Sequence, residues 1–426
     1  MPKAIIIGAG VIGASIALEL ARSGYHVLVL DKGPGIGTGS TSASSAVVRF
    51  NYSTFDSVAL AWEAFHCWKN WREHLGVNLP AYTQLHDVGV IMLDVPVMSI
   101  EGTQALFRAA GIPFERWSSS DLEANATYLD SGSYWPPKSI NDEAFYHEAT
   151  SKLGAIYTPN GGYIDDPKLA AENLAAAAAA LGAVFRFKSE VTKFDIADGH
   201  INGLWVNGEY EEADIVVNAC GPWSAKVNEL AGVGDDFTIS LRPMRQEVHQ
   251  VDTPRGLLPG PIVGDVDLGT YMRPASNGSL LVGGTEPECD PLEWVEDVDL
   301  VNMNRTAERF EAQVTRAARR LPALQIPNAP MGIVGVYDVA ADWTPIYDRT
   351  SIAGFYVAVG TSGNQFKNAP AVGQLMAFLI SHIEAGHNHD EDPLIFIGEH
   401  TKNEINLGAF SRKRPYNSLN THSVMG

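Results

Sequence analysis

Cysteine is scarce in this sequence. The 426 residues include three cysteines, Cys67, Cys220 and Cys289, which are odd in number and far apart. This pattern excludes a zinc site built on paired cysteines and is typical of a reducing cytoplasm. We therefore expect a cytoplasmic protein without a metal site. Residues 1–3 lead directly into an apolar segment, so we expect no export signal.

Positive charge and long apolar runs are also lacking. Lys and Arg number 30 against 50 Asp and Glu, and the formal net charge of −20 argues against binding to nucleic acid or to an anionic membrane surface. No run of about 18 apolar residues occurs, so we expect no membrane span. With 45% hydrophobic and 19% charged residues, the composition is that of a globular protein, and the length predicts two domains.

The N-terminal stretch is rich in glycine. Four apolar residues predict a short buried strand, and Gly8, Gly10 and Gly13 then fit the pattern G-x-G-x-x-G before an amphipathic run. A second apolar strand ends on Asp31. In such a βαβ unit the first glycine allows a tight turn, the second lets the backbone approach a pyrophosphate, and the third lets helix and strand pack closely. Asp31 can accept hydrogen bonds from a ribose, so the unit predicts a dinucleotide site.

Small and hydroxyl-bearing residues mark three further stretches. Residues 40–46 are almost all Ser, Thr or Ala, and Arg49 follows shortly after. Such hydroxyls can donate hydrogen bonds to phosphate oxygens or cap a helix. Two later apolar strands end in small and polar residues, at 218–224 and at 360–370.

The order of these segments indicates how the domains are arranged. Pieces of an α/β domain recur at the start, after residue 150 and after residue 330, with strand-rich pieces between them. This order predicts a discontinuous nucleotide-binding domain (1–80, 150–225 and 330–385), an interleaved antiparallel substrate or cap domain (81–149 and 226–329) and a C-terminal tail (386–426).

Apolar periodicity predicts the longer helices, at 54–75, 99–110, 167–181, 299–320 and 371–383. Asp166 is the expected N-cap of the third, with Pro167 at its first position. In the polar tail, residues 387–392 are rich in His and Asp. We interpret them as a solvated linker because no rigid helix holds their side chains in place for a metal.

The four glycine-rich and polar stretches together resemble the D-amino acid oxidase superfamily of flavoproteins, in its sarcosine oxidase and dimethylglycine oxidase branch. The resemblance covers about residues 4–383. It rests on the stretches 8–31, 40–49, 218–224 and 354–370. It implies α/β plus α+β architecture, in which a Rossmann-like FAD-binding domain of the GR2 type is interleaved with an antiparallel-sheet substrate domain that covers the flavin.

The resemblance also implies which residues bind FAD. The N-terminal unit is expected to bind the ADP half, and the Ser-rich stretch is expected to lie along the pyrophosphate and flavin. A backbone contact is expected at the adenine, and backbone N–H groups near residue 363 are expected at the pyrimidine end of the flavin. The residues implied are Gly8, Gly10, Val11, Ile12, Gly13, Asp31, Lys32, Ser40, Ser42, Ser44, Ser45, Val191, Gly221, Gly360, Ser362, Gly363, Asn364, Gln365, Phe366 and Lys367.

Arg49 and Lys367 match the pair that holds the substrate carboxylate in the sarcosine oxidases. A carboxylate moved from water into a closed pocket needs opposite charge, and a guanidinium can hold it at two places. Tyr337 stands where the glycine oxidase and D-amino acid oxidase branches have an arginine, which favours secondary or tertiary N-alkyl amines. Tyr271 is expected either as a wall of this pocket or simply as a strand aromatic.

Two departures from the family pattern affect the chemistry. Gly335 stands where the monomeric sarcosine oxidases attach flavin to a cysteine, so we predict non-covalent FAD. Leu281 stands where those enzymes have a lysine that activates oxygen. The electron acceptor is therefore left open between oxygen and a carrier protein.

These observations predict flavin-dependent oxidation of the C–N bond of a secondary or tertiary N-alkyl amino acid to an imine that hydrolyses. The flavin carries the chemistry and the protein positions a small carboxylate-bearing amine. A first alternative is an FAD-dependent D-amino acid, glycine or proline oxidase or dehydrogenase. A second is an NAD-dependent dehydrogenase or a subunit of a redox complex.

Overall fold

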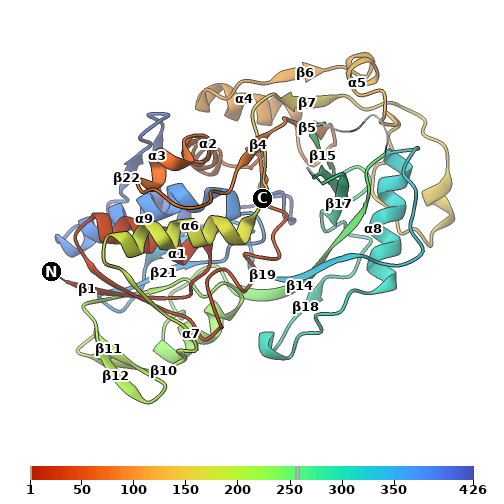
Figure 1. The fold of residues 1–426 in the computed structure, drawn as a ribbon. Helices are drawn as coiled ribbons and strands as arrows, with labels where there is room; N and C mark the ends of the chain where they lie inside the picture. The colour runs from red at the N-terminus through yellow and green to blue at the C-terminus, as the bar shows by residue number, and fades with distance from the viewer. Residues whose placement is uncertain (1, 255–256, 258–259, 276) are drawn as a thin grey trace.

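A computed structural model describes residues 2–254, 257, 260–275 and 277–426 of the chain. Met1 and the other omitted positions fall in the predicted ranges 1–80 and 226–329 and lie outside the described residues. The molecule has two parts, one around a parallel sheet and one around a large, mostly antiparallel sheet (Figure 1).

The first part contains a six-stranded sheet in the order β20-β21-β13-β1-β2-β9. Five of its strands run parallel, and β20 pairs antiparallel with β21. Its strands are β1 (Lys3–Ile7), β2 (His26–Leu30), β9 (Val184–Arg186), β13 (Ile215–Asn218), β20 (Ile346–Arg349) and β21 (Phe355–Val359). Apolar residues fill both faces of this sheet, as expected where layers cover a parallel sheet on both sides.

Helices cover one face of the parallel sheet and a small sheet covers the other. On the first face, α1 (Val11–Arg22) packs between α6 (Pro167–Ala180) and α9 (Ala369–Glu384). Asp166 caps α6 by accepting the Leu169 N–H, and Pro167 begins the helix, as predicted. The opposite face carries α7 (Ser224–Ala231) and the antiparallel strands β10 (Val191–Ala197), β11 (His200–Val206) and β12 (Glu209–Glu212).

The turn after β1 depends on close backbone packing. Gly8 has φ +110°, and a Cβ on it would lie 2.3 Å from the Ala219 carbonyl oxygen at the end of β13. A Cβ on Gly13 would lie 1.9 Å from the Gly8 carbonyl oxygen, which holds α1 against the turn. These two glycines therefore have the predicted steric roles.

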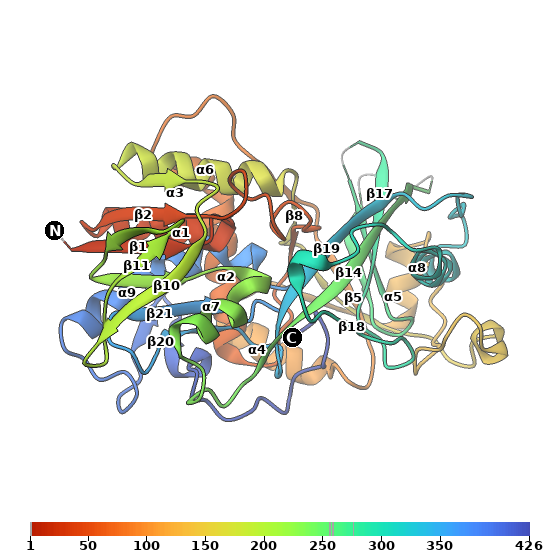
Figure 2. The same cartoon turned by 90° about the horizontal axis from the view of Figure 1, so that it is seen from below.

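The second part is a nine-stranded sheet joined to the first by long strands (Figure 2). β14 (Leu241–Asp252) pairs with β17, β18 and β19, and α8 (Ala307–Arg320) packs over it. The other strands are β5 (Val90–Leu93), β6 (Glu115–Trp117), β7 (Ala155–Thr158), β15 (Ile262–Asp265), β16 (Thr270–Pro274), β17 (Ser279–Gly284), β18 (Glu293–Trp294) and β19 (Gly332–Ala340). β7 and β19 belong to this sheet. The sequence predicts instead that residues 150–225 and 330–385, which contain these strands, lie in the nucleotide-binding domain.

Smaller elements complete the fold. Two short sheets pair β3 (Val47–Val48), β8 (Gly162–Ile164) and β4 (Leu85–Asp87), and β22 (Ile395–Ile397) with β23 (Glu404–Asn406). The remaining α-helices are α2 (Phe55–Lys69), α3 (Trp71–Leu75), α4 (Ile100–Ala110) and α5 (Ser119–Asn125). Short 3₁₀ turns are η1 (Glu143–Tyr146), η2 (Gly221–Trp223), η3 (Val298–Leu300), η4 (Phe366–Asn368) and η5 (Leu407–Phe410).

Two predicted helices differ from those in the structure. The helix expected over 54–75 breaks at Asn70, whose φ of −110° and ψ of 41° are not helical. The helix expected from 299 begins only at Ala307, because Thr306 caps it by accepting the Arg309 N–H. Within the described part of the chain, the helices are too short or too polar to traverse a lipid bilayer.

The C-terminal tail packs onto the body of the molecule, and the prediction of a solvated linker at 387–392 is wrong. His389 is buried, and Asp390 holds the buried guanidinium of Arg412 at 2.8 Å. Arg412 also pairs with Asp348 on β20 and with Asp236. The charged residues of the tail pair with one another and with the parallel-sheet domain. Local periodicity in the sequence does not reveal such pairs.

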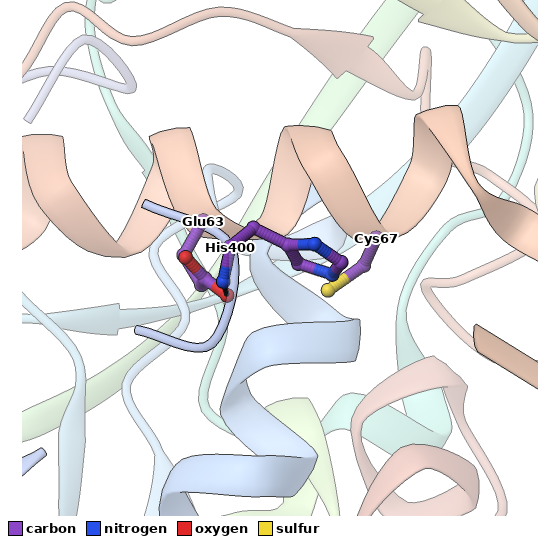
Figure 3. A group of neighbouring side chains, drawn as sticks. All are labelled: Glu63, Cys67 and His400. Atoms are coloured by element: carbon purple, nitrogen blue, oxygen red, sulfur yellow. Dashed lines mark hydrogen bonds between the residues drawn. The ribbon is translucent and has the colours of Figure 1, made fainter. Parts of the chain in front are cut away.

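Helix α2 holds the tail through Glu63 (Figure 3). The buried Glu63 carboxylate accepts the His400 N–H at 2.8 Å and the Thr401 N–H at 2.9 Å. The thiol of Cys67 and the His400 imidazole lie beside it, with potential ligand atoms within 4.8 Å of one another. Because both Glu63 oxygens already accept hydrogen bonds from the tail, docking of the tail accounts for this buried carboxylate.

Replacing Gly13 with alanine should destabilise the parallel-sheet domain. The new methyl would meet the Gly8 carbonyl, and relieving the overlap should lower the free energy of unfolding by about 2 kcal/mol or more. Urea denaturation measures this difference. Gly35→Ala is the matched control because its Cβ would meet only the Thr38 methyl at 3.7 Å. Equal stability of the two variants would contradict the steric role of Gly13.

Candidate active site

A cavity of about 1220 Å³ lies between the two parts of the molecule. Its wall combines the turn after β1, the end of β2, the Ser-rich loop and the end of β13 with β14 and β19 of the large sheet. Ordinary small-molecule pockets measure roughly 300–1,000 Å³. The volume therefore fits a dinucleotide that extends from the parallel sheet to the antiparallel sheet.

One end of this cavity is the N-terminus of α1. Asp31 accepts the Ala9 N–H at 2.7 Å and the Gly33 N–H at 2.6 Å, so its carboxylate is fixed beside the glycine turn. The Thr41 hydroxyl accepts the Val11 N–H at 3.0 Å and would meet a Cβ on Gly10 at 3.2 Å. Sequence reasoning missed Thr41, although it lies within the Ser-rich stretch that indicated this site.

Most residues predicted to bind the cofactor line the large cavity. Those in its wall are Gly8, Gly10, Val11, Ile12, Asp31, Lys32, Ser40, Ser44, Ser45, Val191, Gly221, Gly363, Gln365 and Phe366. Asn364 and Lys367 line a smaller adjoining cavity. Four predicted residues are absent from the described parts of both walls: Gly13, Ser42, Gly360 and Ser362.

The residues outside the walls hold the loops in shape. The Ser42 hydroxyl donates to the Gly39 carbonyl, and the Ser362 hydroxyl donates to the Gly360 carbonyl and accepts the Ala340 N–H. The Gly360 N–H donates to Asp338 at 2.6 Å.

Asp338 was missed because an acidic residue within an apolar strand carries no motif. Burial raises its pKa to about 7, while the N–H groups of Gly360 and Thr361 act in the opposite direction. Asp338 ties β19 to the loop that begins at Gly360.

The smaller cavity, of about 60 Å³, brings together the four residues predicted to contact substrate. Arg49, Lys367, Tyr271 and Tyr337 all line it, and it shares Ser44, Ser45, Tyr337, Gly363 and Phe366 with the large cavity. The two cavities therefore adjoin each other at these shared residues.

Arg49 and Lys367 are buried cations, with 6% and 4% of their surface exposed. Arg49 donates to the carbonyls of Asn51 and Val424, and Lys367 donates to the Asn364 carbonyl at 2.6 Å. Burial lowers the pKa of both, and the Arg49 charge lowers the pKa of Lys367 further. Neither cation forms an ion pair with a carboxylate in the part of the chain that is described.

Three tyrosines shape this cationic pocket. Arg49 and Lys367 both lie over the Tyr52 ring, at 5.1 and 4.9 Å from its centroid. The Tyr271 hydroxyl and the Ser45 hydroxyl are 3.0 Å apart, and burial raises the Tyr271 pKa to about 12. Burial also raises the pKa of Tyr337 well above its usual value, so the phenols are neutral. Tyr271 is thus a wall of the pocket.

The two departures from the family pattern also have places in the structure. Gly335 lies on β19 in the wall of the large cavity. A Cβ added to it would lie 3.0 Å from the Ala43 methyl. Leu281 lies on β17, and the described residues of the two cavity walls do not include it. The lysines that do line the cavities are Lys32, Lys188, Lys226 and Lys367.

The glycine turn, the cavity and the parallel sheet are typical of a dinucleotide-binding protein, and the antiparallel sheet forms the other side of the cavity. A protein-family model described as FAD dependent oxidoreductase (DAO) matches residues 3–379, and the chain belongs to this family. The predicted superfamily and fold class are confirmed, whereas the sarcosine oxidase branch stays a prediction.

Similar proteins cover most of the chain. FAD-dependent oxidoreductase domain-containing protein 1 of Bos taurus is 26% identical over 418 residues, which cover 88% of this chain and 80% of the relative. Glycine oxidase of Geobacillus kaustophilus is 27% identical over 390 residues, covering 89% and 93%. The crystal structure of L-proline dehydrogenase from P. horikoshii shares the fold, with a TM-score of 0.76, 22% identity and 97% coverage of both chains.

FAD is therefore the cofactor, and the cavity fits it. The N-terminus of α1 can receive a pyrophosphate, and Asp31 stands at the expected ribose position. Gly8 and Gly13 make close backbone contacts at the turn, and a side chain at either would collide with main-chain atoms. The family thus sets aside a nicotinamide cofactor.

We expect the FAD to be released by acid. Gly335 has no thiol to form the covalent link expected in the monomeric sarcosine oxidases, and non-covalent contacts are lost when acid unfolds the chain. After precipitation of the purified protein and centrifugation, absorbance near the flavin maximum should be found in the supernatant. A yellow pellet would show a covalent link, and the three cysteine positions would then be tested by peptide mapping.

Proposed function

We propose that this enzyme oxidises the C–N bond of a small amine that carries a carboxylate, with a preference for secondary N-alkyl amino acids. The observation that carries the proposal is the pair of buried cations, Arg49 and Lys367. A buried charge normally has a partner of opposite charge. Among the described residues, the direct partners of these two are carbonyl groups and the Tyr52 ring, which supports an anionic ligand in the adjoining cavity.

The position of the pocket supports oxidation of the same ligand. The cationic cavity adjoins the large cavity and shares wall residues with it, so a carboxylate held by Arg49 would place the rest of a small molecule close to the cofactor site. A guanidinium suits a carboxylate because it can donate two parallel hydrogen bonds. Lys367 would add a second point charge.

The preference for a substituted nitrogen rests on Tyr337 and on the family. Tyr337 is neutral, so it cannot take the carboxylate role that an arginine has at this position in the glycine oxidase and D-amino acid oxidase branches. The L-proline dehydrogenase with the same fold acts, by its name, on a cyclic secondary amine. A neutral aromatic wall leaves room for an alkyl group near the nitrogen.

Bound FAD would supply the acceptor for the hydride, which carries the two electrons lost by the substrate carbon. The chain binds and orients the amine: Arg49 and Lys367 hold the carboxylate, and Tyr271 and Tyr337 exclude water from the reacting end. Loss of hydride and the nitrogen proton gives an imine, which adds water and separates into a carbonyl compound and an amine.

A substrate panel tests the proposed function. Under anaerobic conditions, sarcosine or L-proline should bleach the oxidised flavin of the purified holoenzyme, whereas N-methyl amines without a carboxylate should not. The visible spectrum measures this, and admission of air then distinguishes an oxidase from a dehydrogenase that needs a carrier. Bleaching by the carboxylate-free amines alone would contradict the role of the cationic pocket.

Removing either cation should weaken substrate binding without loss of FAD. Arg49→Met and Lys367→Met each delete a charge-assisted hydrogen bond, which is worth roughly 1.5–3 kcal/mol or about 10- to 150-fold in Kd. Anaerobic flavin titration with the best substrate of the panel measures the Kd. Lys69→Met is the control because Lys69 is an exposed lysine of α2. Wild-type affinity in both variants would remove these residues from the site.

A further inference from the structure

The main chain of Val424 occupies the space between Arg49 and Glu286. The Val424 carbonyl accepts a hydrogen bond from Arg49 at 2.6 Å, and the Val424 N–H donates to Glu286 Oε2 at 2.6 Å. Residues 423–426 are buried, and the segment lies between the two parts of the molecule, where C marks its position (Figures 1 and 2). A tail segment therefore reaches the cationic pocket.

These two hydrogen bonds fix the separation between the Arg49 guanidinium and the Glu286 carboxyl. The N–H and the C=O of one residue are attached to the same Cα, so Arg49 and Glu286 are spanned by a single N–Cα–C unit. An α-amino acid presents its amine and carboxylate on the same unit. The distance between the Arg49 donor and the Glu286 acceptor thus suits the two polar ends of an α-amino acid.

Glu286 is absent from the described walls of both cavities, but its carboxyl contacts one wall residue of each. Its Oε1 accepts from Gln246 at 2.9 Å, and Gln246 lines the large cavity, whereas Val424 lines the small one. Glu286 has φ +49°, a conformation that non-glycine residues rarely adopt and that is concentrated at functional sites. Burial raises its pKa to about 8, and the charges of Arg309 and Arg49 oppose this shift.

We propose that Arg49 and Glu286 form a clamp for the carboxylate and the amine of an α-amino acid, and that the Val424 main chain fills this clamp when no substrate is bound. This inference rests on the proposed function and narrows it. A substrate enters by replacing the Val424 C=O with its carboxylate and the Val424 N–H with its amine N–H. Hydrogen bonds between charged groups are roughly twice as strong as neutral ones, so a substrate can displace the tail.

The clamp makes a specific demand on the substrate. The nitrogen must carry a hydrogen for Glu286 and must be attached to the carbon next to the carboxylate. N-methylglycine satisfies both conditions, as does proline. A neutral tertiary amine has no hydrogen to donate, and 4-(methylamino)butanoate has its amine two carbons too far from the carboxylate.

Two kinds of variant should move substrate affinity in opposite directions. With sarcosine and L-proline as probes in anaerobic flavin titrations of the holoenzyme at pH 9, above the Glu286 pKa of about 8, Glu286→Gln should raise the Kd at least about tenfold because the amine loses its charged acceptor. Val424→Pro removes the N–H that Glu286 accepts and should release the tail. Its Kd should be at least about fivefold lower than that of Val424→Ala, which also removes the branched side chain but keeps the N–H. FAD content and melting temperature check that each variant is folded.

The double variant separates the clamp from a general effect on folding. If the tail competes through Glu286, the difference between Val424→Pro and Val424→Ala should disappear in a Glu286→Leu background, which has no side-chain acceptor for the Val424 N–H. Sarcosine should also bind at least about tenfold more tightly than 4-(methylamino)butanoate to the wild type. If sarcosine or proline reduces the wild-type flavin but the Glu286 and Val424 variants leave their Kd unchanged, the clamp is overturned and the proposed function stands. If no carboxylate-bearing amine reduces the wild-type flavin, both fail.

Discussion

Two positive charges held out of water impose the strongest constraint on this molecule. Arg49 and Lys367 lie over one tyrosine ring with main-chain carbonyls as their only hydrogen-bond acceptors among the described contacts. Burying a cation costs several kcal/mol unless polar groups replace its hydration. The chain supplies these groups from three distant places, the residues after β3, the loop before η4 and the tail. The positions of all three are therefore tied to the same pair of charges.

The constraint also explains why the pocket is suited to an anion. Carbonyl dipoles satisfy hydrogen bonds but leave the net charge of the two cations uncompensated. A carboxylate can provide both acceptors and charge, so its arrival replaces weaker partners with stronger ones. The two carboxyl oxygens of Glu286 already accept hydrogen bonds from Gln246 and Val424, so they do not contact Arg49 directly. The Arg49 guanidinium and the Glu286 carboxyl are thus separated by the main chain of one residue, along the direction in which the proposed substrate would lie.

Local sequence patterns predicted the parts of the structure whose causes are local. The βαβ unit follows from apolar periodicity and from glycines whose missing side chains prevent collisions, and Asp31 follows from its place at a strand end. The Ser-rich and glycine-rich motifs identified the right loops, but not which atoms face the cavity: Ser42 and Ser362 shape the backbone instead. Glu286 and Val424 could not be found, because their roles depend on contacts more than a hundred residues apart in the chain and no spacing records such contacts.

The order of strands in the parallel sheet has a consequence for biosynthesis. β1 lies between β2, which follows it closely, and β13, which is made about two hundred residues later, and β13 in turn pairs with β21 near residue 355. The ribosome must therefore complete most of the chain before the central sheet can close. Non-local pairing of this kind folds slowly and leaves strand edges open for longer. Cofactor capture is consequently a late event, and the supply of FAD at that moment would govern how much of the newly made chain escapes aggregation.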